Sequence, residues 1–561
     1  MSWYVCDFET TIEDDPRVWE WEALSDDEKC TGTDIESYMI WLLSESRTVY
    51  FHNMKFDSSY ILSWLFQHGW THVWEKADRS FTTIISDMGQ YYMVRIWKDD
   101  VTVTIYDSYK IVSLSVHDIA GAYGLAESKG EIDYSLPRPP GYQPTAEEWD
   151  YLHRDCLIVH RALSIVFAAG LDRMTQSANA YAQFVEMTGK KNFLKLFPML
   201  TLQQDEFCRK AYYGGSAQVG KLFKGQEVGE GIVLDYNSMY PAKMRYELLP
   251  YGRPVYQMGK IEATEEYPLF IQRLTCSLKL KDDHIPSVMG KHISRFRDVK
   301  FLEDSEGIIE LTLTNIDIAL MMDQYDVENI TWLDGFRFRG SRKLFCDFID
   351  HWTAEKESAA MEGNKGKRQI AKDMMNKLSG KFGTKRWLKK KEPYYDGRVK
   401  HRAVEDADEA TKGYVPVIAF ITSYGRDGII RNAQANYSRF LYMDTDSLHL
   451  LGTEFPDGID IDDYRLGAMK IEGHFYRGKY LHAKCYIEEM DLDEKEAERG
   501  QYPVSGDRMT KVTIAGLPGN CRRQVSFGNF HVGAIYTGKL KPVYHSTGIV
   551  LEETTFQISD I

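Results

Sequence analysis

Acidic residues at the ends of predicted strands indicate a first place where metal-dependent chemistry could occur. Asp7 and Glu9 follow an apolar strand start, and side chains two apart on a strand project to the same face. Asp57 begins a helix after a second strand, while Tyr151 and Asp155 lie four apart and share one helix face. Acids that converge from separate elements repel one another unless divalent metals bridge them. This first acid set predicts two-metal hydrolysis of a phosphodiester, with Tyr151 orienting the attacking water.

A second acid set lies in the C-terminal part. Asp235 ends the apolar strand 231–234, and a helix should begin near Pro241, where free backbone N–H groups can hold a triphosphate. Asp444 and Asp446 are again two apart, so we expect them to share a face with the residue between them pointing away. An isolated Asp-x-Asp is more often a surface turn or a calcium loop. With Asp235 present, the pattern favours two metals that bridge a primer 3′ hydroxyl and an incoming nucleotide.

Basic residues between the members of this second set could balance a triphosphate. Arg368, Lys372 and Asn376 recur every four residues, which places them on one face of a helix that we expect to end at Gly380. A solvated basic face explains this pattern equally well when it is taken alone.

Two further segments offer groups to nucleic acid. Lys484 and Tyr486 would lie on one face of a strand, in a position suited to a primer terminus. Thr422 and Arg426 offer a hydroxyl and a guanidinium to a phosphate backbone.

The elements that must position these groups form two large units, because 561 residues exceed what one hydrophobic core can organise. The first third alternates short apolar strands with helices, which is typical of an α/β unit. A polar stretch, 174–180, should link it to a second α/β region with insertions. We predict strands at 3–6, 48–51, 82–85, 91–97 and 101–106, and helices at 35–43, 58–68 and 146–169.

Composition limits the class of protein. The net charge of −15 argues against nucleic-acid binding in general, although the run 381–402 is strongly basic and could be a DNA contact or a solvated loop. The eight cysteines are scattered singly, so we expect reduced thiols and no zinc. The start of the chain has neither a basic segment nor a long apolar run, which predicts a soluble, intracellular protein without a membrane segment.

The first acid set resembles the three exonuclease motifs of proofreading DNA polymerases, DxE, Nx(2-3)(F/Y)D and YxxxD, in the same order. The resemblance implies a 3′→5′ exonuclease in which Asp7, Glu9, Asp57 and Asp155 bind metal and Tyr151 positions water. A further segment, 129–134, is similar to another exonuclease element. By the same resemblance, the single-stranded end should be held by Thr10, Asn53, Phe56, Tyr60, Ser108, Tyr109, Lys129 and Tyr134.

The second half resembles the protein-primed family B DNA polymerases of phages and linear plasmids. Versions of their motifs DxxSLYP, Kx3NSxYG, Tx2GR, YxDTDS and KxY occur here in order, and a YxGG element at 212–215 links the two halves. The resemblance implies a DNA-directed DNA polymerase with two Mg²⁺ or Mn²⁺ ions per active site and deoxynucleoside triphosphates as substrates. It also implies primer-template DNA and single-stranded DNA as partners, a terminal-protein primer, a monomeric state and a place in the host cytoplasm.

The resemblance assigns roles within the polymerase site. Metal would be held by Asp235, Tyr236 and Asp446, with Asp444 in support. The nucleotide would be met by Tyr240 as the steric gate against a ribose, and by Lys356, Arg368, Lys372, Asn376 and Ser379. DNA would be contacted by Tyr212, Gly214, Gly215, Thr422, Arg426, Lys484 and Tyr486. Two residues depart from the family pattern NSxYG: Lys377 replaces its serine and Ser379 replaces its tyrosine. The loss of the tyrosine predicts open space beside the nascent base pair.

The implied architecture is a multidomain α/β (α+β) fold. An RNase H-like exonuclease domain, 1–175, would precede a polymerase domain, 176–561. The latter would comprise palm 176–246 and 416–518, insertion one 247–343, fingers 344–383, insertion two 384–415 and thumb 519–561. In the family, the two insertions are associated with holding the terminal-protein primer and encircling DNA.

Two other interpretations stay open. Residues 442–444 begin like the YMDD motif of reverse transcriptases, although Thr445 separates the acids here. A non-catalytic DNA-binding scaffold for replication, built on a degenerate polymerase, is the other, although both acid sets are complete.

Overall fold

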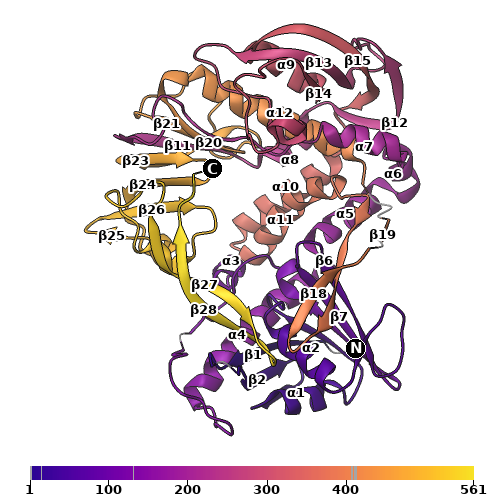
Figure 1. Ribbon diagram of the computed structural model, residues 1–561, viewed down its shortest axis with the longest axis vertical. Helices are drawn as coiled ribbons and strands as arrows, with labels where there is room; N and C mark the ends of the chain where they lie inside the picture. Colours follow the sequence, from indigo (N-terminus) through magenta and orange to yellow (C-terminus); the bar gives the residue numbers. More distant parts are fainter. Residues whose placement is uncertain (1–2, 14, 131, 406–407, 410–412, 561) are drawn as a thin grey trace.

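An open mixed sheet forms the N-terminal unit, drawn in indigo and purple in Figure 1. The computed structural model describes residues 3–13, 15–130, 132–405, 408–409 and 413–560. Three parallel strands form the centre of the sheet: β1 (Trp3–Thr10), β4 (Arg47–Phe51) and β8 (Val101–Asp107). Antiparallel neighbours extend it on both sides: β2 (Val18–Leu24) and β3 (Lys29–Gly32) beside β1, and β7 (Tyr91–Lys98) and β6 (Ser80–Ser86) beside β8. The short β5 (Thr71–His72) pairs with β6 in parallel.

The alternation of β1 separates its core from its acids. Tyr4, Cys6 and Phe8 join an apolar cluster on one face, whereas Asp7 and Glu9 occupy the other face. The helices of this unit are α1 (Ile35–Leu42), α2 (Asp57–Gln67), α3 (Val116–Tyr123) and α4 (Ala146–Ala168).

The predicted linker at 174–180 is wrong, because helix α5 (Gln176–Thr188) begins there. Its polar residues make local bonds that a linker would leave to water. The Thr175 side chain accepts a hydrogen bond from the N–H of Ala178, and the buried Asn179 bonds to Leu171 and Arg173.

The palm is a five-stranded sheet, with order β22-β11-β21-β20-β9. Its strands are β9 (Ala217–Val219), β11 (Gly231–Tyr236), β20 (Phe440–Asp444), β21 (Ser447–Leu451) and β22 (Met469–Phe475). Helices α8 (Met239–Tyr246) and α12 (Val415–Ala435) pack on it through a shared apolar cluster. A second five-stranded sheet follows, made of β10 (Glu227–Val228), β23 (Arg477–His482), β24 (Cys485–Asp491), β26 (Arg508–Ile514) and β25 (Val504–Ser505), with α13 (Glu494–Gly500) and α14 (Gly519–Arg522) nearby in the chain.

The predicted fingers are two antiparallel helices, α10 (Cys346–Met361) and α11 (Lys365–Phe382). Helix α11 passes the predicted end at Gly380 and stops at Phe382, because that ring is buried in an aromatic cluster with Phe184, Phe197 and Phe345. Helices α6 (Lys190–Leu196) and α7 (Leu202–Lys210) complete the support around α5.

Of the two predicted insertions, the first forms a four-stranded sheet of its own and the second joins the N-terminal sheet through one hairpin. Insertion one contains β12 (Leu249–Met258), β13 (Leu269–Leu280), β14 (Ile309–Thr314), β15 (Tyr325–Ser341) and α9 (Asn315–Gln324), at the top of Figure 1. Insertion two contains β16 (Trp387–Leu388), β17 (Lys390–Tyr395), β18 (Val399–Ala403) and β19 (Asp408–Glu409). Strand β17 pairs with β6, so the β17–β18 hairpin extends the N-terminal sheet.

A long C-terminal hairpin, β27 (Ile535–Tyr544) and β28 (Ile549–Gln557), returns the chain to the N-terminal unit (Figure 1). At its tip, the carbonyl of Ser546 accepts hydrogen bonds from the Gln67 side chain at 2.8 Å and from the Tyr395 hydroxyl at 3.2 Å. The hairpin, insertion two and the N-terminal unit therefore meet at one point. Within the described residues, no helix is both long and apolar enough to cross a membrane.

Candidate active sites

The first acid set converges on one cavity of about 680 Å³ between the N-terminal sheet and the C-terminal hairpin. Asp7, Glu9, Asp57 and Asp155 all line it, together with Tyr151. They arrive from β1, the first residue of α2 and one face of α4, as the spacing predicted.

Uncompensated negative charge dominates this cavity. Burial, followed by the charge of Asp155, raises the pKa of Asp7 to about 7. Burial, followed by the charge of Asp7, raises the pKa of both Glu9 and Asp57 well above the usual range for carboxyl groups. Such a set favours either protons or cations.

Lys129 supplies one cation to the cavity. Its ammonium lies 2.5 Å from Asp155 and 5.4 Å from the ring centroid of Tyr151. Burial is the largest single effect and disfavours the charge on this lysine, but the charges of Asp155, Tyr151 and Asp7 and the hydrogen bond to Asp155 together outweigh burial, so the pKa of Lys129 is raised. The other oxygen of Asp155, Oδ1, is buried without a hydrogen-bond partner.

Five of the eight residues expected to hold a single-stranded end line the same cavity: Thr10, Asn53, Phe56, Lys129 and Tyr134. The other three do not line it. Ser108 is buried and hydrogen-bonds to Phe51 and His52, Tyr109 packs edge-on against His52, and Tyr60 is covered by the C-terminal hairpin.

Some residues of this site were missed by the sequence analysis. Residues 540, 542 and 549–551 of the C-terminal hairpin line the cavity, which the distance along the chain hid. Glu20 and Glu22, on β2, pair directly across from Glu9 and Asp7 and are fully buried. Because β2 was not predicted, its alternating Trp-Glu-Trp-Glu pattern, which signals a strand with an acidic face, was not used.

The second acid set forms at the palm. Asp235 is the penultimate residue of β11 and Asp444 is the last residue of β20, while Asp446 lies in the tight turn before β21. The expectation that Asp444 and Asp446 share a continuous strand face is wrong, because Thr445 adopts a left-handed backbone with φ of 62°. The turn still keeps the acids together: the N–H of Asp446 donates to the carbonyl of Asp444 at 2.7 Å, and the N–H of Tyr236 donates to the carbonyl of Asp446 at 2.9 Å.

Mutual repulsion also marks this set. Burial, followed by the charges of Asp446 and Glu472, raises the pKa of Asp235 to about 7. Burial is likewise the main cause of the raised pKa of Asp446. Glu472, on β22, is a further acid that the sequence analysis did not identify.

The fingers present cations to these acids. The charges of Lys372 and, from β22, Lys470 oppose the rise in the pKa of Asp235. Burial, followed by the charges of Arg368, Lys372 and Lys470, lowers the pKa of Lys356. Asn376 is half-buried on the same helix face. Ser379 is only 3% exposed, so the predicted open space beside it is not present.

Small residues allow close approach around the palm turn. A Cβ atom on Gly215 would stand 2.4 Å from Oγ1 of Thr445, so the YxGG segment needs glycine there, while Gly214 is exposed. Tyr240 is half-buried and lies against Gly425 of α12, where an added Cβ would be 3.3 Å from its ring.

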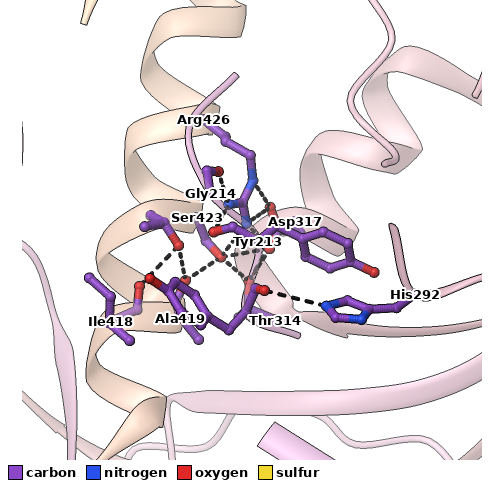
Figure 2. Close-up of polar contacts among 11 residues, drawn as sticks. Tyr213, Gly214, His292, Thr314, Asp317, Ile418, Ala419, Ser423 and Arg426 are labelled. Atoms are coloured by element: carbon purple, nitrogen blue, oxygen red, sulfur yellow. Dashed lines mark hydrogen bonds and ion pairs between the residues drawn. The ribbon is translucent and has the colours of Figure 1, made fainter. Parts of the chain in front are cut away.

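Thr422 and Arg426 do not offer groups to a phosphate backbone, because α12 is covered on this side by insertion one. Thr422 is 3% exposed and donates to carbonyls of its own helix, while Arg426 is 2% exposed. Figure 2 shows the Arg426 guanidinium paired with Asp317 at 2.8 Å and bonded to the carbonyls of Tyr213 and Gly214. Arg426 therefore holds the YxGG segment, which also includes the half-buried Tyr212, against the palm.

Lys484 and Tyr486 do not share a regular strand face as predicted. Lys484 has φ of 57° and precedes β24, and its ammonium reaches Asp444 at 2.6 Å. Tyr486 packs against the ring of Tyr442, whose hydroxyl donates to Asp444 at 3.1 Å. Both residues therefore act on the palm acids, Lys484 directly and Tyr486 through Tyr442.

The donor set at each site suits a hard divalent cation, because it consists of carboxylate oxygens with raised pKa values and, at the first site, an unpartnered buried oxygen. Within the described residues, no three such side chains already surround one point. A bound ion would have to draw the carboxylates together.

Comparison with known proteins identifies the family. A model for DNA polymerase type B, organellar and viral, matches residues 42–138 and 137–463. The DNA polymerase of Bacillus phage Nf is 40% identical, with 99% of each chain covered. Two structures of Phi29 DNA polymerase cover 100% of both chains: a ternary complex with primer-template DNA and incoming nucleotide (TM-score 0.92, 38% identity) and a complex with single-stranded DNA (TM-score 0.92, 37% identity).

The chain therefore belongs to the type B DNA polymerases of organelles and viruses, and it is a DNA-directed DNA polymerase. Its end-to-end match to phage enzymes places it in the protein-primed group that its motif order indicated. The predicted fold is confirmed: an RNase H-like N-terminal domain precedes palm, fingers and thumb. The domain boundaries stay predictions.

Proposed function

We propose that this polymerase also degrades DNA from the 3′ end and that each activity uses its own pair of divalent ions. Mg²⁺ or Mn²⁺ would be held by Asp7, Glu9, Asp57 and Asp155 at the N-terminal site, and by Asp235, Asp446 and the Tyr236 backbone at the palm. Bound metal would lower the pKa of the attacking water or of the primer 3′ hydroxyl and balance the negative charge that develops on the phosphate.

One observation carries the exonuclease proposal: four carboxylates from three separate elements line one cavity that also contains Tyr151 and Lys129. Repelling buried acids destabilise a fold unless they serve a ligand. Tyr151 would orient the attacking water, and Phe56 and Tyr134 would stack on bases of a single-stranded end. By likeness to Phi29 DNA polymerase, which forms complexes with both kinds of DNA, this chain would bind primer-template DNA at the palm and single-stranded DNA in this cavity.

The test separates the two sites. Asp7→Ala with Glu9→Ala should abolish degradation of labelled single-stranded DNA and leave primer extension, because a lost metal ligand removes several kcal/mol of transition-state stabilisation and each ~1.4 kcal/mol is tenfold in rate. Asp446→Ala should do the reverse. Wild-type degradation by the first variant would refute the exonuclease proposal, and wild-type extension by the second would refute the palm assignment.

We also infer that a terminal protein primes synthesis, on the basis of the family and of an insertion one that packs beside the palm turn. The expected product is a deoxynucleotide covalently joined to a hydroxyl of a protein encoded on the same genome. Incubation of that protein with the polymerase, Mn²⁺ and labelled dATP should label the protein. The label should stay on the protein band after denaturation, because the bond is covalent. Extension of DNA primers with no labelled protein would contradict protein priming while leaving the polymerase itself intact.

A further inference from the structure

Lys470 stands beside the catalytic acids of the palm on a strand that the motifs do not include. In the β11–β22 ladder it is the direct partner of Asp235, and directly opposed residues project to the same face of a sheet. Glu472 lies at a β-bulge two residues on, and its ion pair with Lys470 and its effect on the pKa of Asp235 place it on the same side of the sheet. Lys470 therefore lies on the palm sheet directly beside Asp235.

The partner of Lys470 holds it weakly. Its ammonium is 3.5 Å from Glu472, and the two side chains are 34% and 49% exposed. An exposed pair at this separation contributes little and exchanges partners easily. The lysine can therefore turn toward an anion that enters the cleft.

Other cations face Lys470 from the fingers. Besides burial, the charges of Arg368, Lys372 and Lys470 lower the pKa of Lys356, so the four cations form one electrostatic group. Within the described residues, Lys356, Arg368 and Lys372 have no carboxylate within ion-pair distance, so these three cations can pair with an anion that enters the cleft, although Lys372 also interacts with Asp235 at longer range. Three of its members lie on α10 and α11, and only Lys470 lies on the palm side.

We propose that Lys470 is a phosphate-binding residue that contacts the triphosphate of the incoming nucleotide from the palm side, opposite the fingers cations. The inference rests on the proposed assignment of Asp235 and Asp446 as the polymerase metal site. A triphosphate that spans from metal at Asp235 to Lys372 must pass between these two walls. An ammonium on the palm wall supplies a point charge to its outer phosphates and, after reaction, to the leaving pyrophosphate.

The test is the Lys470→Met variant in single-turnover primer extension with Mg²⁺ at saturation. We expect the dissociation constant for dATP to rise roughly tenfold, since one charge-assisted contact is lost, with the maximal rate changed far less. The concentration of pyrophosphate needed for the reverse reaction should rise in parallel. Lys470→Arg should restore most of the affinity. The matched control is Lys260→Met, because Lys260 forms a similar pair with Glu262, at 3.3 Å, on insertion one.

Melting temperature and primer-template affinity check that Lys470→Met is folded. A dATP dissociation constant within twofold of wild type would overturn the inference. So would an effect confined to the Mg²⁺ concentration required, because the lysine would then only compete with metal for the acids. Failure of the proposed function is distinguishable: in that case Asp235→Asn would still extend primers, whatever the Lys470 variants do.

Discussion

Tyr60 donates a hydrogen bond from its hydroxyl to the carbonyl of Ile549 at 2.8 Å, which ties α2 of the N-terminal unit to the C-terminal hairpin. The contact is buried, and Gly548 is required beside it because an added Cβ would stand 2.2 Å from the ring. The hairpin that Tyr60 holds also lines the cavity that contains the first acid set. Tyr60, which the sequence analysis expected to bind single-stranded DNA, therefore stabilises the position of the hairpin.

We expect Tyr60→Phe to loosen the hairpin without unfolding the protein. The Ile549 carbonyl would lose its buried partner, which costs roughly 1–3 kcal/mol and so raises local opening by about tenfold or more. Hydrogen exchange at 546–550 should accelerate accordingly. Tyr4→Phe, which removes a hydroxyl bonded to Glu28 in the same unit, is the control. Unchanged exchange at the hairpin tip would show that the bond does not hold it.

Lys129 sets the pH range of the exonuclease in our second prediction. Burial raises the pKa of Asp155, and the Lys129 ammonium opposes that rise. In Lys129→Met the pKa of Asp155 should climb further, so the ionised carboxylate that metal requires would form only at higher pH. The rate of single-stranded DNA degradation against pH, at fixed Mg²⁺, should therefore shift upward, and Lys129→Arg should shift it back. An equal loss of rate at every pH would instead assign the lysine to DNA binding alone.

Glu20 makes metal-free stability dependent on pH. It is fully buried without a hydrogen-bond partner, and burial, followed by the charge of Glu148, raises its pKa from 4.5 to about 8. The folded protein then holds a proton that the unfolded chain releases, so stability is greatest below pH 4.5 and falls as pH rises toward 8.

Glu20→Gln should remove that dependence. With a chelator present, the gain of the variant over wild type in urea unfolding should grow with pH, from about 1 kcal/mol at pH 5 to about 4 kcal/mol at pH 8. Glu13→Gln, at a surface ion pair with Arg17, should show no such trend. A constant difference between Glu20→Gln and wild type across this pH range would mean that Glu20 is already ionised.

The sequence identified the acids because each set depends on local spacing. Asp7 with Glu9, and Tyr151 with Asp155, share a face by the period of one strand or one helix. Glu20 and Lys470 depend instead on the register between strands, and Lys470 meets Asp235 only through β22, from a distant part of the chain. No local pattern specifies such a pairing.

Burial explains why Arg426 was misinterpreted. A hydroxyl and a guanidinium near the palm motifs suggest a phosphate contact, but α12 lies between the palm sheet and insertion one. Asp317, on α9, pairs with Arg426 there, and no motif indicated it. The same basic side chain can serve DNA or an internal ion pair, and only the tertiary packing decides.

We therefore expect Arg426→Met to cost about 3–5 kcal/mol of folding stability, because Asp317 is left as a buried unpaired charge. Adding Asp317→Asn should recover part of the loss, which a double-mutant cycle in urea would measure.

Thr422→Val should leave primer-template affinity unchanged. Weaker binding of primer-template DNA by that variant would support the phosphate contact that the burial of Thr422 argues against.

Tyr240 closes the sugar side of the nucleotide site in our last prediction. Its ring packs against Gly425, and its raised pKa, about 12, follows from burial. Tyr240→Val would clear the space that a 2′ hydroxyl needs, so the preference for deoxynucleotides over ribonucleotides should fall at least about tenfold, while dATP use stays near wild type. Competition between dATP and ATP in single-nucleotide incorporation measures the ratio, and Tyr246→Val, on an exposed face of the same helix, is the control. Gly425→Ala offers an independent check, because its methyl group would press on the Tyr240 ring and should lower dATP use without admitting ATP. If Tyr240→Val left the ratio unchanged, discrimination would have to come from another side chain around the sugar.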